Sequence, residues 1–145
     1  MDLEGTMLPR TIFLSRLLGL WVLIVAMAVM LHKAAMVGIA ADFGNAPGLL
    51  FISGVFTVLA GLAMVLGHNI WTGGAAPVVV TLVGWAMLIK GIGLVFISPG
   101  EAAGLLAASH FAEYAYVYGG VLLVLGLYLT YAGFLGDHAK RHAES

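Results

Sequence analysis

Four long apolar runs dominate this sequence and leave few folds open to it. They cover approximately residues 12–31, 49–66, 77–97 and 114–135. A helix needs about 20 mostly apolar residues to cross a hydrocarbon core of about 30 Å, so each run is long enough to span a membrane. A membrane β-barrel would show short segments of alternating polarity instead. The sequence therefore predicts an all-α, polytopic membrane protein in which residues 1–145 form a single transmembrane domain with four spans.

The distribution of charge supports this prediction and excludes several classes of function. Hydrophobic residues make up 62% of the chain and charged residues 9%, and the charges gather at the ends of the apolar runs. With a net charge of -1 and no basic patch, nucleic acid is excluded as a partner. The absence of cysteine excludes disulfides, thiolate metal sites and a cysteine nucleophile. The lipid bilayer is the partner that this composition predicts.

A short helix is predicted between the third and fourth spans. Ser98 is suited to an N-cap, Pro99 to the first helical position, and Glu101 to the reciprocal bond of a capping box. The segment that follows, to about residue 109, is rich in Ala and Leu. We expect it to lie at the membrane surface.

The positions of Lys and Arg predict the orientation of the chain. Arg10 and Arg16 precede the first span, Lys140 and Arg141 follow the fourth, and Lys33 stands at the opposite side. Cytoplasmic segments carry an excess of positive charge. We therefore expect a multi-pass protein of the cell inner membrane, with its N- and C-termini in the cytoplasm.

Small residues recur at intervals of seven in all four spans. Seven residues are nearly two helical turns, so each set forms one stripe, here called a glycine seam. Helices associate in lipid through close van der Waals approach, and a seven-residue spacing favours left-handed crossing. The seams predict a compact left-handed four-helix bundle, with the alternative that some seams contact other copies or another subunit. Their members are Gly19, Ala26, Gly54, Gly61, Gly84, Gly91, Gly119, Gly126 and Gly133.

Lys90 is the foremost candidate for a functional polar residue. It lies inside the third span, about 10 Å from its outer end. A lysine within a span marks a transport or binding site, or it extends its ammonium toward the interface. We expect Asp42 or Glu101 to be its acidic partner, with Glu113 as a third choice. Lys33 and His68 continue two of the seams and are secondary candidates at opposite mouths of the bundle.

A metal or haem site is a further hypothesis. His110 and Glu113 are three residues apart and share a face if the segment is helical. His32, expected at the same membrane face, is the candidate third ligand. No nucleophile motif, phosphate-binding glycine loop or dinucleotide fingerprint accompanies these residues. We therefore expect no enzymatic activity, and we assign no cofactor.

A resemblance to a family groups some of these candidates. The segment Gly67-His68-Asn69-Ile70-Trp71, followed by Leu82-Val83-Gly84-Trp85 and Leu88-Ile89-Lys90-Gly91, resembles a pattern of small four-helix bacterial integral membrane proteins. It covers the second and third spans and implies no activity. The residues that the resemblance groups together are His68, Asn69, Trp71, Trp85 and Lys90.

Three functions follow as hypotheses. The leading one is an accessory subunit or homo-oligomer that acts through helix packing, within a larger membrane complex or with copies of itself. The second is a small transporter or channel component that uses Lys90 with an acidic partner. The third is a redox or metal-binding membrane subunit that uses His32, His110 and Glu113.

Overall fold

The computed structural model describes residues 9–143, and the side chains of residues 9–135. Over this range the chain forms six helices and no strand. Four of the helices are long and apolar enough to cross a membrane, which confirms the expected all-helical class with four candidate spans. The helices are α1 (Pro9–Leu31), α2 (Lys33–Gly44), α3 (Pro47–Gly67), α4 (Ala75–Phe96), α5 (Pro99–Ala108) and α6 (Phe111–Ala143).

Local sequence signals explain where several helices begin. Pro47 stands in the first turn of α3, where a missing backbone N–H costs nothing. Gly73 and Gly74 precede α4 with φ angles of 86° and 111°, a left-handed region that glycine enters without strain. At α5 the Ser98 side chain accepts a bond from the Glu101 N–H, and the Glu101 carboxylate accepts one from the Ser98 N–H. The predicted capping box is therefore present, and α5 is the short helix expected before the fourth span.

Helix α2 is a departure from the sequence analysis, which treated the segment around Asp42 only as a connection. His32 has non-helical φ and ψ angles of -126° and 44°, and it breaks the helix between α1 and α2. The residues after it are mostly Ala, Val, Met and Ile, which are compatible with helix but too few to form a span. The two outer corners of the molecule therefore both contain a short helix.

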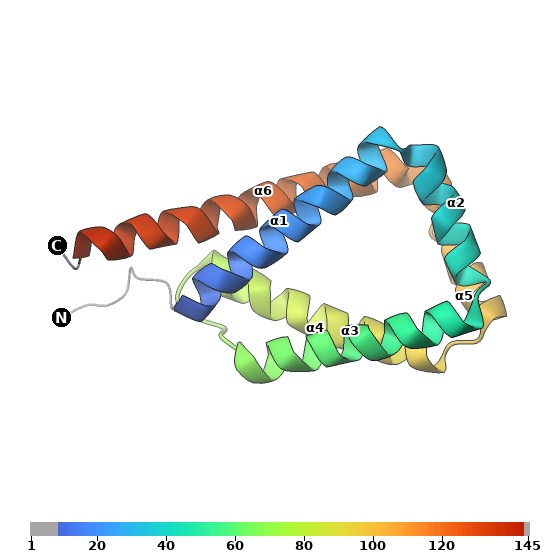
Figure 1. The fold of residues 1–145 in the computed structure, drawn as a ribbon, viewed down its shortest axis with the longest axis horizontal. Coiled ribbons are helices and arrows are strands. Elements are labelled where there is room, and N and C mark those ends of the chain that lie inside the picture. The colour runs from blue at the N-terminus through green and yellow to red at the C-terminus, as the bar shows by residue number, and fades with distance from the viewer. Residues whose placement is uncertain (1–8, 144–145) are drawn as a thin grey trace.

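The four long helices are arranged as two pairs. Helix α1 packs along α6, and α3 packs along α4 (Figure 1). The pairs approach each other where α1 begins and α3 ends, here called the closed end. They diverge toward the opposite or open end, where α2 and α5 pack against each other and connect the pairs (Figure 1). The four long helices are thus arranged as a wedge (Figure 1), and the left-handed crossing expected for a compact four-helix bundle stays a prediction.

An apolar core joins the two pairs near the closed end. It contains Leu18 from α1, Met64 from α3, Val80 from α4 and Leu129 from α6. Partly buried apolar side chains of α1, α4 and α6 surround these four. We call this group the apolar plug, because all four long helices meet in it.

Seam glycines lie where the helices of each pair touch. A Cβ added at Gly61 would lie 2.5 Å from the Leu88 backbone nitrogen, and one at Gly91 would lie 2.5 Å from that of Val58. The same construction at Gly19 meets the Thr130 backbone nitrogen at 2.5 Å. By contrast, a Cβ at Gly93 would have no such neighbour within 4 Å. The seams thus bring backbones together inside the chain, α1 with α6 and α3 with α4.

Candidate functional site

A cleft of about 610 Å³ lies between the diverging pairs at the open end. All six helices contribute to its wall, which is almost entirely apolar. It forms because α2 and α5 hold the two pairs apart at the open end (Figure 1). One representative from each helix, in chain order, is Val29, Phe43, Leu50, Leu94, Leu106 and Phe111.

Lys90 is the one charged side chain among the described residues that line this cleft. Its position on α4 is fixed by its neighbour Gly91, which contacts the backbone of α3 at Val58. Because Gly91 is buried against α3, the residue before it, Lys90, is turned away from that contact. The Lys90 side chain is exposed and borders the cleft together with Leu94 and Ile97.

The acids expected to pair with Lys90 are engaged elsewhere or exposed. No ion pair joins Lys90 to an acid in the part of the chain that the structure describes. The Glu101 carboxylate accepts bonds from the Ser98 hydroxyl at 2.7 Å and the Ser98 N–H at 2.9 Å, and these bonds lower the pKa of Glu101. Glu113 pairs with His110, and Asp42 is exposed at the end of α2. The expected Lys90 partnership with Asp42 or Glu101 is therefore not formed.

An ammonium group that has no acidic partner in apolar surroundings is stabilised by an anionic group or by water. Transfer of a charge away from water is unfavourable unless a counter-charge or water compensates it. A lysine stem is flexible and lets the ammonium reach a partner several ångströms away. The cleft thus combines apolar walls with one positive charge.

Lys33 occupies a different environment from Lys90. Its Nζ lies 4.8 Å from the centre of the Tyr116 ring, a cation–π contact between α2 and α6. Lys33 and His32 border a separate hollow at the corner between α1 and α2. Neither residue lines the cleft that contains Lys90.

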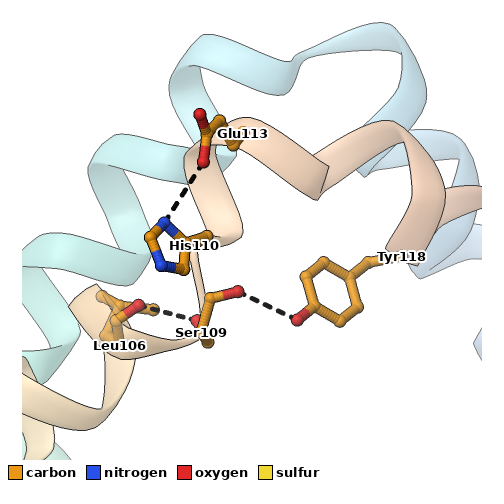
Figure 2. Close-up of polar contacts among 5 residues, drawn as sticks. All are labelled: Leu106, Ser109, His110, Glu113 and Tyr118. Carbon is orange, nitrogen blue, oxygen red and sulfur yellow. Dashed lines mark hydrogen bonds and ion pairs between the residues drawn. The ribbon is translucent and has the colours of Figure 1, made fainter.

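His110 and Glu113 lie close together at the corner between α5 and α6 (Figure 2). The His110 Nδ1 is 3.2 Å from the Glu113 Oε2, and the two side chains are 62% and 71% exposed. His110 has a φ of 49°, an unusual left-handed conformation for a residue with a Cβ. No group of three metal-binding side chains occurs among the described residues, so His32 does not complete the predicted ligand set.

Two further hydrogen bonds secure the same corner. The Ser109 hydroxyl donates to the Leu106 carbonyl at 2.7 Å, and the Tyr118 hydroxyl donates to the Ser109 carbonyl at 3.0 Å (Figure 2). The hydrogen bond from Tyr118 joins the end of α5 to the second turn of α6. The corner that carries Phe111 into the cleft wall is therefore fixed by its own bonds.

Three residues of the sequence pattern quoted above, Asn69, Trp71 and Trp85, meet at the loop between α3 and α4. The Asn69 Oδ1 accepts from the Trp71 Nε1 at 2.8 Å and from the Trp85 Nε1 at 3.4 Å. His68 is only 2% exposed and begins this loop. Lys90 is not part of this group, because it lies further along α4 and lines the cleft.

Sequence analysis missed three buried polar residues at the closed end. Thr11, Ser15 and Thr81 are each at most 1% exposed. The signal that could have found the first two is their four-residue spacing on one helix face, at the start of the first predicted span. Thr81 bonds to both backbone groups of Ile70, at 3.0 Å from the N–H and 2.9 Å from the carbonyl.

Comparisons with known proteins found no similarity that carries a function. No protein-family model matches the chain, and no curated protein or solved structure matches it either. Function is therefore inferred from the geometry and charge of the cleft.

Proposed function

We propose that this chain is a four-span protein of the inner membrane that binds an anionic amphiphile in the cleft between its helix pairs. The observation that carries the proposal is the position of Lys90. Among the described residues it is the one charged side chain on an almost entirely apolar wall, and no acid pairs with it. The cleft volume, about 610 Å³, lies in the range typical of small-molecule sites.

The charge of Lys90 decides the class of ligand more strongly than the apolar wall does. A hydrocarbon tail gains little by leaving bulk lipid for a protein groove, because both surroundings are equally apolar. An ion pair is strengthened when the surroundings have a low dielectric constant. The cleft should therefore select by headgroup charge, and accept many tails that carry a carboxylate or phosphate.

Transport through the same cleft would require a movement of the helices that binding does not require. The apolar plug of Leu18, Met64, Val80 and Leu129 lies between the open end and the closed end. A transporter that used Lys90 would need the two pairs to separate at this plug. The geometry favours a binding or carrier function, and a continuous channel is not the function we propose.

The orientation of the chain in the membrane and its association with other subunits are inferred from its basic residues and its glycine seams. We place both termini on the cytoplasmic side, because Arg10 and Arg16 lie at the start of α1. The cleft would then face the outer side. Association with another subunit, which the seams suggested, would have to use the lipid-facing surfaces, since the seam glycines contact other helices of the same chain.

Photolabelling of the purified protein in nanodiscs tests the function. The probe is a long-chain fatty acid with a photoreactive group in its tail, and labelled peptides are mapped by mass spectrometry. We expect labelling of α5 and α6 residues at the cleft, a loss of about tenfold or more in Lys90→Met, and retention in Lys90→Arg. A tenfold loss corresponds to about 1.4 kcal/mol.

Lys33→Met is the matched control, because it removes a lysine that does not line the cleft. It should leave the labelling unchanged. Competition separates the two sources of the anionic group: oleate and phosphatidylglycerol are compared with zwitterionic phosphatidylethanolamine. Equal labelling of wild type and a correctly folded Lys90→Met variant would overturn the proposal.

A further inference from the structure

The closed end contains polar side chains that are buried without partners. His68 is 2% exposed, and Thr11 and Ser15 are 0% exposed. Within the described part of the chain, neither ring nitrogen of His68 and neither hydroxyl has a hydrogen-bond partner. Buried polar atoms in proteins are nearly always paired, so four unpaired atoms at one end of the molecule call for a partner.

The register of the helices places Ser15 and His68 at about the same depth. Leu18 and Met64 meet in the apolar plug. Ser15 precedes Leu18 by about one turn of α1, and His68 follows Met64 by about one turn at the end of α3. Because α1 and α3 run in opposite directions (Figure 1), both steps lead toward the closed end. Thr11 lies one further turn along the face of Ser15, and we call the three residues the polar layer.

The loop that carries His68 is held firmly by its other residues. The Thr81 hydroxyl forms hydrogen bonds with both the N–H and the carbonyl of Ile70. The Asn69 side-chain oxygen accepts hydrogen bonds from the indole N–H groups of Trp71 and Trp85. The backbone N–H of His68 donates to the Met64 carbonyl at 2.7 Å. These bonds fix His68 in its buried position while none of them reaches its ring.

We propose that the polar layer is an internal hydration site that holds ordered water on the closed-end side of the apolar plug. A buried water needs two to four polar partners. The two ring nitrogens of His68 and the hydroxyls of Thr11 and Ser15 supply four. Two hydroxyls and one imidazole suit a neutral hydrogen-bonding guest better than a metal ion, and the described residues contain no cluster of metal ligands.

This site lies beyond the proposed function and does not depend on it. The cleft with Lys90 is at the open end, and the polar layer is on the other side of the plug. The guest of the layer is water, and the guest of the cleft is an amphiphile.

Water-edited nuclear magnetic resonance of the full chain in bilayers tests the proposal, with water itself as the probe. Histidine is labelled with ¹⁵N and leucine with ¹³C, and the signals of His68 and Leu129 are identified by their loss in His68→Phe and Leu129→Ala. We expect magnetisation from water to reach the His68 ring as fast as it reaches the exposed ring of His110. A build-up at His68 as slow as that of the Leu129 side chain would overturn the proposal, because Leu129 lies in the plug and is fully buried.

A pair of variants tests whether the three residues share the water. The double variant Thr11→Val, Ser15→Ala should slow the build-up at His68 several-fold. Thr130→Val is the matched control, because Thr130 also has a buried hydroxyl with no partner among the described residues but lies against Gly19 in the contact of α1 with α6. An unchanged build-up in the double variant would refute the shared site. Lys90→Met should not alter the His68 signal, so failure at the cleft and failure at the layer are separate results.

Discussion

The same four long helices pack differently at the two ends of the molecule. At the closed end the pairs meet through the large side chains of the apolar plug, and the polar residues are buried. At the open end α2 and α5 keep the pairs apart, and Lys90 borders a cleft. The glycine seams bring the helices of each pair together, whereas the apolar plug joins the two pairs near the closed end. The apolar plug and the cleft are thereby separated along the length of the molecule.

The largest expected effect comes from the seam inside a pair. Gly91→Leu should prevent α3 and α4 from packing, because the added Cβ would lie 2.5 Å from the backbone of Val58, which cannot move aside alone. We expect a loss of about 3 kcal/mol or more, at the upper end of overpacking effects. Unfolding by SDS titration in mild detergent measures it.

Gly93→Leu is the control for this comparison. Gly93 is two residues away on the same helix, and a Cβ there would have no neighbour within 4 Å. Its effect should be within about 0.5 kcal/mol, as for other surface substitutions. Similar losses in both variants would show that α3 and α4 do not pack along the seam described.

The apolar plug should be next in size. Leu129→Ala removes a fully buried side chain from the plug, whereas Leu105→Ala removes one from the cleft wall that is 64% exposed. In lipid the transfer term nearly cancels, so the cost of Leu129→Ala is mainly that of a cavity, on the order of 2 kcal/mol. Leu105→Ala should change the free energy of unfolding little. Equal effects would mean that the pairs do not meet at the plug.

The loop at the closed end offers a smaller and more local effect. Thr81→Val removes the hydroxyl that bonds both backbone groups of Ile70, and we expect a cost of about 1–2 kcal/mol. Hydrogen exchange at the Ile70 amide should accelerate roughly tenfold. Thr57→Val serves as the reference, because the Thr57 hydroxyl only donates to the Ser53 carbonyl of its own helix. Unchanged exchange at Ile70 would show that the hydrogen bonds of Thr81 do not stabilise this loop.

The smallest effect is expected at α5, which helps to keep the cleft open. Ser98→Ala should destabilise the start of this helix by about 1 kcal/mol, whereas Ser98→Thr should preserve the cap. Hydrogen exchange at the Ala102 amide reports the change. Comparable exchange in Ala and Thr variants would show that the cap is dispensable.

The same cap has a predictable dependence on pH. Hydrogen bonds from the Ser98 hydroxyl and then the Ser98 backbone lower the pKa of Glu101 in the folded chain. The folded pKa is therefore below the unfolded one, and the stabilisation is present above the ordinary carboxylate pKa. It should be lost as the pH falls through the lowered pKa of Glu101. Glu101→Gln should abolish this dependence, and its persistence there would assign it to another group.

Much of the secondary structure could be predicted because its causes are local. The four spans follow from the length of the apolar runs, and the start of α5 follows from Ser98, Pro99 and Glu101. Helix α2 was missed because its small apolar residues gave neither a span nor a cap signal; the His32 side chain makes no cap bond. The site was less predictable, since Lys90 was identified as a candidate but its surroundings were not.

The sequence by itself determined the membrane class, the four candidate spans and the stripe of small residues on each. These properties depend on residues a few positions apart on one helix, where period and polarity can be counted. Only the tertiary structure decided that α1 lies on α6 and α3 on α4, that Lys90 faces a cleft without an acid, and that His68 is buried. Those outcomes depend on many weak contacts between distant segments, such as the bond from the Arg16 Nε to the Gly133 carbonyl across 117 residues. No local pattern encodes such a sum, because each seam could pack against any of the others.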